Sequence, residues 1–244
     1  MASVLPIPFP TDGSVQRKTS RGYLQDLLIP NSFDYDVFED MFWGDAVNAR
    51  YPAAKTNGTS AAVTLTEHTA NGGLKLVSGT ADNGYAGQGV GMNYTGDRGV
   101  LFEAMVTLPG AITTMKFEVG LSDADDDAGA VNVKATPNAT ATDYAVFVFD
   151  TDDDTTIAFH SAKNGTITAT EGIVTAAVDT TYRFGIRVQD DTIAAFLNGV
   201  QVAGGSHVIE GGNALTPWAF CQARTGSASR TLLVKKWRVI QPSR

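Results

Sequence analysis

The segment from residue 182 to 205, YRFGIRVQDDTIAAFLNGVQVAGG, carries the pattern that most restricts the fold. Up to Val188, apolar side chains occupy every second position, and largely polar residues separate them. Such alternation predicts a strand with one solvated face. Asp190-Asp191 reverses the chain, and Asn198-Gly199 is typical of a two-residue hairpin turn, because both residues tolerate positive φ. Three antiparallel strands with one apolar face require a second sheet to cover that face.

Further segments with the composition of strands follow at the short intervals typical of an all-β sandwich, and no low-complexity linker divides residues 59–244. The expected strands are Ala62–Thr66, Gly73–Ser78, Val100–Leu108, Met115–Leu121, Tyr144–Asp150, Thr155–Ser161, Thr166–Thr170, Tyr182–Gln189, Thr192–Leu197, Val200–Ala203, Pro217–Ala223 and Thr231–Ile240. About a dozen strands predict an all-β, two-sheet antiparallel jelly-roll sandwich. Because Tyr144 to Phe149 is apolar on both faces, we expect a central strand whose second face lies under a loop or a neighbouring subunit.

The composition narrows the classes of function. A hydrophobic content of 43% with 18% charged residues excludes general disorder and permits a sizeable core. The formal net charge of -8 argues against nucleic acid as a partner, because phosphate binding needs a concentrated basic surface. No apolar run approaches the roughly 18 residues of a membrane helix, so we expect no membrane partner. Cys221 is the single cysteine, and its apolar surroundings indicate a buried side chain rather than a nucleophile.

Residues 1–32 differ from the rest of the chain. Pro6, Pro8 and Pro10 alternate with other residues, which favours an extended segment and breaks the apolar stretch that a signal peptide requires. We therefore expect a docking arm over residues 1–32 and a sandwich over residues 33–244; the alternatives for the arm are a disordered tail and a tail that wraps its own domain. The expected contact residues of the arm are Leu5, Ile7, Phe9, Arg17, Lys18, Arg21, Tyr23, Leu24, Leu27 and Leu28.

The next segment, residues 33–51, is a dense run of aromatic residues set among acids. It favours a plug that closes the open end of the sandwich. The alternative is a set of rings that stack on sugars, which requires the rings to be exposed in a groove.

Three segments carry a resemblance to a known family: the aromatic FEDMFWGD, the meander YRFGIRVQDDTIAAFLNGVQV and the basic-aromatic LLVKKWRVI. Through them the chain resembles the concanavalin A-like, or laminin G-like, sandwiches, especially those of tailed-bacteriophage virion proteins. The resemblance and the proline-rich arm imply a non-enzymatic structural protein of the virion, made in the host cytoplasm without a signal peptide: a capsid decoration or accessory tail protein. The expected partners are other capsid or tail proteins and further copies of the chain, as a homo-oligomer or in many copies on the particle. The alternative is a carbohydrate-binding, lectin-like module for host-surface glycans.

The same resemblance sets an expectation for catalysis. Enzymes of this superfamily carry acids in the order Glu-x-Asp-x-x-Glu on one strand, so that one acid attacks and the other donates a proton. The nearest fragment here is FEVGLSD, residues 117–123, which has one glutamate. His68, His160 and His207 lie in separate segments without a Ser or Cys motif, and we expect them at the surface or at strand edges. These features predict that the chain is not an enzyme.

Two aspartate clusters raise the question of a calcium site. They lie in SDADDDAG, residues 122–129, and FDTDDDTT, residues 149–156. An EF-hand needs glycine at its sixth position and glutamate at its twelfth, and neither cluster has them. Solvated acidic turns without a cofactor are therefore the expectation, and calcium is the alternative. Its weak candidate ligands are Asp123, Asp125, Asp127, Asp150, Asp152 and Asp154.

Overall fold

The strand β11 (Thr181–Gln189) shows how the alternating pattern becomes structure. Tyr182, Phe184, Ile186 and Val188 are buried, and the residues between them are exposed or partly exposed. In a pleated strand successive side chains point to opposite faces, so one face of β11 enters a core and the other meets solvent. The neighbouring β6 (Val100–Thr107) repeats the same alternation.

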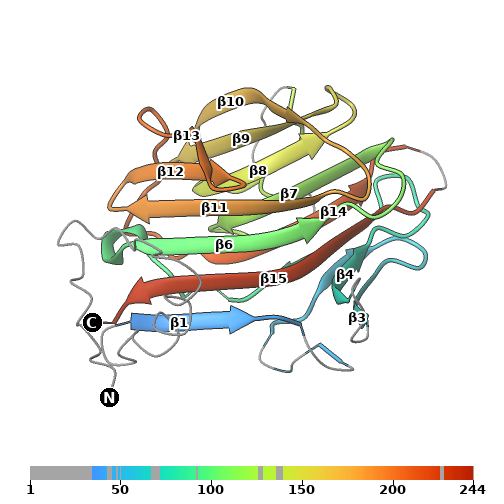
Figure 1. Ribbon diagram of the computed structural model, residues 1–244, viewed down its shortest axis with the longest axis horizontal. Helices are drawn as coiled ribbons and strands as arrows, with labels where there is room; N and C mark the ends of the chain where they lie inside the picture. Colours follow the sequence, from blue (N-terminus) through green and yellow to red (C-terminus); the bar gives the residue numbers. More distant parts are fainter. Residues whose placement is uncertain are drawn as a thin grey trace, which may run out of the picture.

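The computed structural model contains two antiparallel sheets packed face to face (Figure 1). Across the described residues, sheet A contains, in spatial order, β13 (Val200–Ala203), β12 (Thr192–Leu197), β11, β6, β15 (Thr231–Pro242), β4 (Gly73–Val77) and β3 (Ala62–Thr66), with β1 (Tyr35–Asp40) beside β15. Sheet B contains β10 (Thr166–Thr175), β9 (Thr156–Lys163), β8 (Tyr144–Asp150), β7 (Met115–Ser122), β14 (Thr216–Ala223), β5 (Tyr85–Gly89) and β2 (Lys55–Asn57). A 3-10 turn, η1 (Gly96–Arg98), precedes β6.

The residues that the structure describes are 35–42, 46–47, 49, 51–66, 72–91, 93–125, 129–135, 140–225 and 228–243. The expected docking arm and its contact residues lie outside them. Within the described residues, no helix has the length and apolarity needed to cross a membrane.

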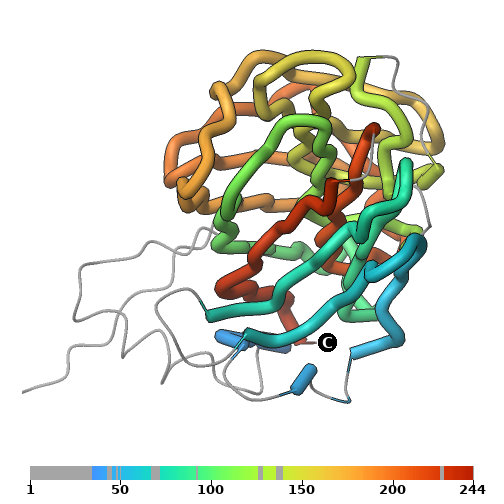
Figure 2. The backbone as a smooth tube through the Cα atoms, turned by 90° about the vertical axis from the view of Figure 1, so that its right-hand side faces the viewer, coloured from blue at the N-terminus to red at the C-terminus, as the bar shows by residue number. Residues whose placement is uncertain are grey.

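The last two strands of the chain lie inside the two sheets. β15 pairs with β6 on one side; on the other, its first half pairs with β4 and its second half with β1. In Figure 2, β15 (red) runs between β6 (green) and β4 (teal). β14 lies between β7 and β5 in sheet B. Both sheets are therefore completed by the end of the chain.

The core fills the space between the sheets with apolar and aromatic side chains. Phe147 of β8 and Phe184 of β11 contact each other across this space, with ring centroids 4.8 Å apart. Phe117 stacks on Phe149 from the neighbouring strand, at 5.4 Å. Each such buried side chain contributes about 1.5–3 kcal/mol relative to an exposed one, so the facing inner surfaces account for the stability of the sandwich.

The expected all-β sandwich is confirmed, and each of the expected strands is present. Boundaries differ most in β10, which continues to Thr175 through a register shift against β9. β1, β2 and β5 were not expected. β5 has the sequence YAGQG, whose glycines lack the β-branched side chains typical of strands, and β2 is three residues long.

The turn at Asn198-Gly199 is confirmed. Both residues have positive φ, 52° and 84°, and they join β12 to β13. The side-chain Oδ1 of Asn198 also accepts a hydrogen bond of 2.9 Å from the backbone N–H of Arg183, which ties the turn to β11.

The aromatic segment forms a strand and then a plug. β1 takes its first residues into sheet A. Phe42 and Tyr51 are buried and pack on Trp237, at centroid distances of 5.4 and 5.8 Å. The Tyr51 hydroxyl accepts a hydrogen bond of 3.0 Å from the Trp237 indole and donates one of 2.7 Å to Asp40. These rings close the sandwich and present no face to a sugar.

Candidate functional site

The outer face of sheet B lies under residues 123–125, 129–135 and 140–143, which are together called the covering segment. At one edge of the sheet Asp125 lies 3.8 Å from Lys55 of β2. At the centre, the carboxylate of Glu118 on β7 accepts hydrogen bonds from the backbone N–H groups of Ala130 and Val131, at 2.6 and 3.0 Å. The covering segment therefore reaches across the sheet. It also explains the doubly apolar β8, whose outer face packs against Ala130, Val131 and Ala141, as expected for a strand under a loop.

A buried ion pair lies beneath the covering segment. Lys116 and Glu118 both point outward from β7; Nζ and Oε1 are 2.7 Å apart, and neither side chain is exposed. The ammonium also donates to the carbonyl of Val131 and lies 5.0 Å from the centre of the Phe220 ring. Burial lowers the pKa of Lys116, and the carboxylate of Glu118 opposes this shift. Glu118 is the single acid on β7, so this strand lacks the two carboxylates of a retaining glycosidase.

An aromatic row flanks this pair on β5 and β14. Tyr85, Phe220 and Trp218 stack in sequence, with centroids 5.6 and 5.9 Å apart, and all three are buried. The Trp218 ring extends over Gly87, where an added Cβ would lie 2.5 Å from the ring. The row belongs to the packed interior, and a sugar ring has no access to it in this conformation.

The aspartates of the second cluster are engaged by cations of the chain itself. Asp150 is buried and accepts a hydrogen bond of 2.8 Å from Nε of Arg224. Asp152 lies 3.7 Å from the same nitrogen. Arg224 also donates to the carbonyl of Asn132, at 2.9 Å, and so holds the covering segment.

Among the described residues, one group of carboxylates has the spacing that suits a metal ion: Asp153, Asp154 and Glu171. The ammonium of Lys134, from the covering segment, lies among these three carboxylates. Its Nζ lies 3.1, 2.7 and 3.3 Å from them. Burial acts to lower the pKa of Lys134, but the hydrogen bonds with Asp154 and Asp153 outweigh burial, and the pKa is raised. An ammonium group thus stands where a cation would bind.

The first aspartate cluster is divided between different contacts. Asp123 accepts hydrogen bonds from the backbone and hydroxyl of Thr142, at 3.1 and 2.6 Å. Asp125 faces Lys55. Asp127 lies outside the described residues. The weak calcium candidates that are described are therefore not brought together as one ligand set.

The expectation for the histidines is wrong for two of them: His160 and His207 are buried. His160 bonds Glu171 through Nε2, at 2.7 Å. His207 bonds the hydroxyls of Ser161 and Thr170, at 2.9 and 2.8 Å. Burial lowers the pKa of both histidines. The expectation failed for His160 because its strand, β9, is covered on both faces. His68 lies outside the described residues.

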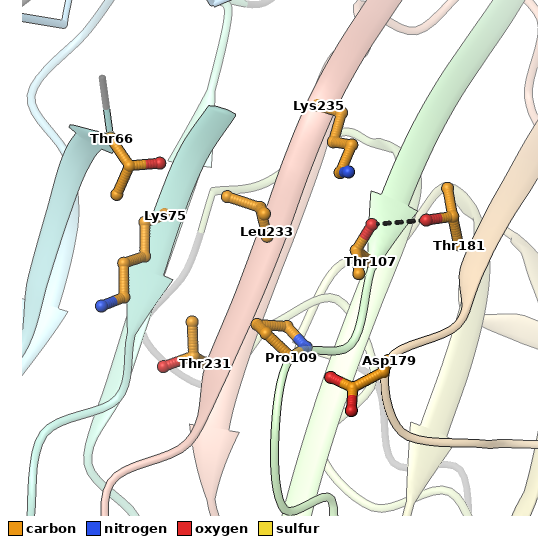
Figure 3. A pocket seen from close by; sticks show the side chains of 9 residues that line it. All are labelled: Thr66, Lys75, Thr107, Pro109, Asp179, Thr181, Thr231, Leu233 and Lys235. Carbon is orange, nitrogen blue, oxygen red and sulfur yellow. Dashed lines mark hydrogen bonds between the residues drawn. The ribbon is translucent and has the colours of Figure 1, made fainter. Parts of the chain in front are cut away.

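A groove open to solvent crosses the outer face of sheet A (Figure 3). It has a volume of about 500 Å³ and brings together side chains from β3, β4, β6, β11 and β15 and from two loops. Pro109 and Leu233 give it an apolar part. Its polar lining consists of Thr66, Lys75, Thr107, Asp179, Thr181, Thr231 and Lys235.

The polar groups of the groove are held in place by local contacts. The hydroxyls of Thr107 and Thr181 bond each other across two strands, at 2.7 Å. The hydroxyl of Thr66 donates to the carbonyl of Gly73, at 3.2 Å. Asp179 has a φ of 55°, and its N–H donates to the carbonyl of Leu108, at 2.8 Å. No pattern in the sequence predicted this site.

A β-bulge in β15 directs one of the lysines into the groove. Val234 pairs with Val106 and Lys236 with Met105, so Lys235 is the extra residue. A bulge lets two successive side chains leave the same face of a strand. Lys235 lines the groove, and Lys236 pairs with Glu39 of β1. Two successive lysines in an alternating strand, as in LLVKKWRV, are the sequence signal for this bulge.

The chain resembles solved structures in its fold, but not any family model or curated protein in its sequence. A scan of protein-family models finds no match, and neither does a search of curated proteins. A solved protein of unknown function from Shewanella oneidensis MR-1 is 12% identical, with a TM-score of 0.60, over 94% of this chain and 96% of that chain. The chain has the concanavalin A-like jelly-roll fold.

Two further structures with this fold act on glucans. SCLam, a non-specific endo-β-1,3(4)-glucanase of family GH16, is 14% identical, with a TM-score of 0.57, over 86% of this chain and 92% of that chain. The catalytic domain of an endo-1,3-β-glucanase (laminarinase) from Thermotoga petrophila RKU-1 is 10% identical, with a TM-score of 0.54, over 86% and 99%. At these identities the likeness concerns the fold.

These comparisons correct two expectations. The interpretation as a structural protein of a bacteriophage virion, whether capsid decoration or accessory tail protein, is contradicted, because the similar structures include endo-glucanases of family GH16 and a laminarinase. The prediction that the chain is not an enzyme is contradicted by the same structures. The carbohydrate-binding alternative agrees better with them.

Proposed function

We propose that this protein binds carbohydrate in the groove on the outer face of sheet A. The observation that carries the proposal is the lining of the groove. Leu233 and Pro109 offer apolar contact, and threonine hydroxyls, two lysines and one aspartate surround them. A saccharide presents apolar C–H faces edged by hydroxyl groups, and a hollow with apolar walls and a few placed polar groups suits such a ligand.

The fold of the neighbouring structures supports the choice of ligand class, because two of them act on glucans. The outer face of sheet B is less suited in this conformation. Its aromatic row is buried, and its central carboxylate, Glu118, is engaged by Lys116 and by the covering segment. A sugar there would have to displace residues 129–135, whereas the sheet A groove is open.

The test is a glycan-array screen of the whole chain, followed by calorimetric titration of the best ligand. Changing Thr107 and Thr181 together to Val removes two hydroxyls from the groove and keeps the shape and strand preference of the side chains. We expect the affinity to fall about tenfold, since each lost hydrogen bond costs about 0.5–1.5 kcal/mol. Thr64→Val, an exposed position on β3 outside the groove lining, should leave the affinity unchanged.

Release of reducing ends from β-glucan is measured with the same samples, because the structural neighbours hydrolyse such polymers. Absence of binding to every glycan on the array contradicts the proposal. So does binding that the Thr107→Val/Thr181→Val variant leaves intact, since the ligand then lies elsewhere.

A further inference from the structure

The charge distribution around the groove narrows the ligand class. Lys75 on β4 and Lys235 on β15 lie on opposite sides of Leu233 (Figure 3). Among the described residues that line the groove, Asp179 supplies the one carboxylate, and it lies beside Pro109. Resting on the proposed function, we propose that the carbohydrate bound here is an acidic saccharide, whose carboxylate or sulfate groups bind Lys75 on one side of Leu233 and Lys235 on the other.

The rest of this face supports an anionic ligand. Among the described residues of the outer face of sheet A, Glu39 pairs with Lys236 and Glu103 with Arg238. Arg183 and Arg187 are exposed on β11. The chain as a whole has a net charge of -8. A face on which cations outnumber acids therefore differs in sign from the protein as a whole. Such a field attracts anions and raises their rate of association.

The sequence also maintains the bulge that positions one of these lysines. At Gly73 on β4, an added Cβ would lie 2.6 Å from the carbonyl oxygen of Val234 and 3.2 Å from Cα of Lys235. A side chain at this position would collide with the bulged backbone. Glycine therefore lets β4 lie against the bulge, and the bulge turns Lys235 outward beside Lys236. Bulges commonly re-aim a side chain next to a functional site.

Two sets of side chains divide the recognition of such a ligand. Charge-assisted hydrogen bonds from the lysines would hold the anionic groups, and these are about twice as strong as neutral ones. The hydroxyls of Thr107 and Thr181 and the carboxylate of Asp179 remain for sugar hydroxyls, which both donate and accept. A neutral glucan would use the second set alone.

The experiment titrates the whole chain with three probes: an oligogalacturonate, a sulfated galactan oligosaccharide and a neutral laminari-oligosaccharide. At low salt we expect one of the acidic probes to bind at least about tenfold more tightly than the neutral one, with an affinity that falls as salt is added. The two acidic probes distinguish a carboxylate from a sulfate ligand.

Lys75→Gln combined with Lys235→Gln should weaken binding of the acidic probe about tenfold or more and should weaken binding of the neutral probe far less. Lys55→Gln, on sheet B, is the matched control and should change neither. Thermal unfolding of each variant verifies that the fold is intact. Tighter binding of the neutral probe, or acidic binding that survives loss of both lysines, overturns this inference and leaves carbohydrate binding standing. If none of the three probes binds, the inference fails here, and the array decides on the proposed function.

Discussion

Lys116 and Glu118 lie two residues apart on one strand, with Nζ and Oε1 2.7 Å apart, and both side chains are fully buried. The pair is formed within sheet B and sealed by the backbone of Ala130 and Val131. Removing one partner leaves the other charge without compensation in a medium of low dielectric constant. The stability of the chain should therefore depend strongly on this pair.

We expect Glu118→Gln to lower the free energy of unfolding by about 3–5 kcal/mol. Asp125→Asn, which removes the partly exposed partner of Lys55, should cost less than about 1 kcal/mol. Urea denaturation of both variants measures the difference. Equal effects would mean that the buried pair is not special.

Stability should fall as the pH is lowered from 7 to 5. The pKa values of His160 and His207 lie below the ordinary 6.5 because both rings are buried. Below pH 6.5 the unfolded chain therefore binds protons that the folded chain does not, which favours unfolding by up to about 1.4 kcal/mol per pH unit for each histidine. Replacing both histidines with Gln should flatten the slope of unfolding free energy against pH in this window. An unchanged slope would assign the effect to other groups.

The hairpin turn gives a third prediction. Gly199 has a φ of 84° and no atom within 4 Å of an added Cβ, so any cost of substitution there comes from the backbone conformation. Gly199→Val should destabilise the protein by about 1–3 kcal/mol. Gly185→Ala, whose Cβ would make ordinary contacts with Phe196, should be tolerated. Melting temperatures measure both effects: backbone strain in Gly199→Val, and added side-chain volume in Gly185→Ala.

Removal of metal ions should leave the melting temperature of the parent protein unchanged, because the ammonium of Lys134 already neutralises Asp153, Asp154 and Glu171. In Lys134→Met these three carboxylates lose that cation. We expect added calcium to raise the melting temperature of the variant alone, by an amount that grows with calcium concentration. A fall in the parent's stability on treatment with a chelator, reversed by calcium, would contradict this explanation.

The sequence predicted the fold wherever local pattern and tertiary environment agreed. The alternation from Tyr182 to Val188 and the Asn198-Gly199 turn are local signals, and both are confirmed. β5 was missed because its glycine at position 87 is required by a distant ring, that of Trp218, and not by strand preference. The burial of His160 was missed for a related reason, because the covering segment that packs on the outer face of β9 lies elsewhere in the sequence.

The groove could not have been predicted from residue patterns in one segment. Lys75, Thr107 and Lys235 are far apart in the sequence and meet through the pairing of β4 and β6 with β15. The doubled lysine at positions 235–236 was visible, but its meaning depends on the bulge, which is defined by the partner strand. Sites assembled from several strands need the register of those strands before their chemistry can be recognised.

The position of β14 and β15 in the interior of the two sheets has a consequence during protein synthesis. Until residues 216–242 have been made, β6 lacks β15, one of its two neighbours in sheet A, and β7 and β5 are not yet joined in sheet B. The nascent chain must then carry unpaired strand edges and uncovered aromatic side chains, which are prone to pair with other chains. Release of the final strands should trigger cooperative closure of both sheets, and premature termination within this region should yield aggregating products.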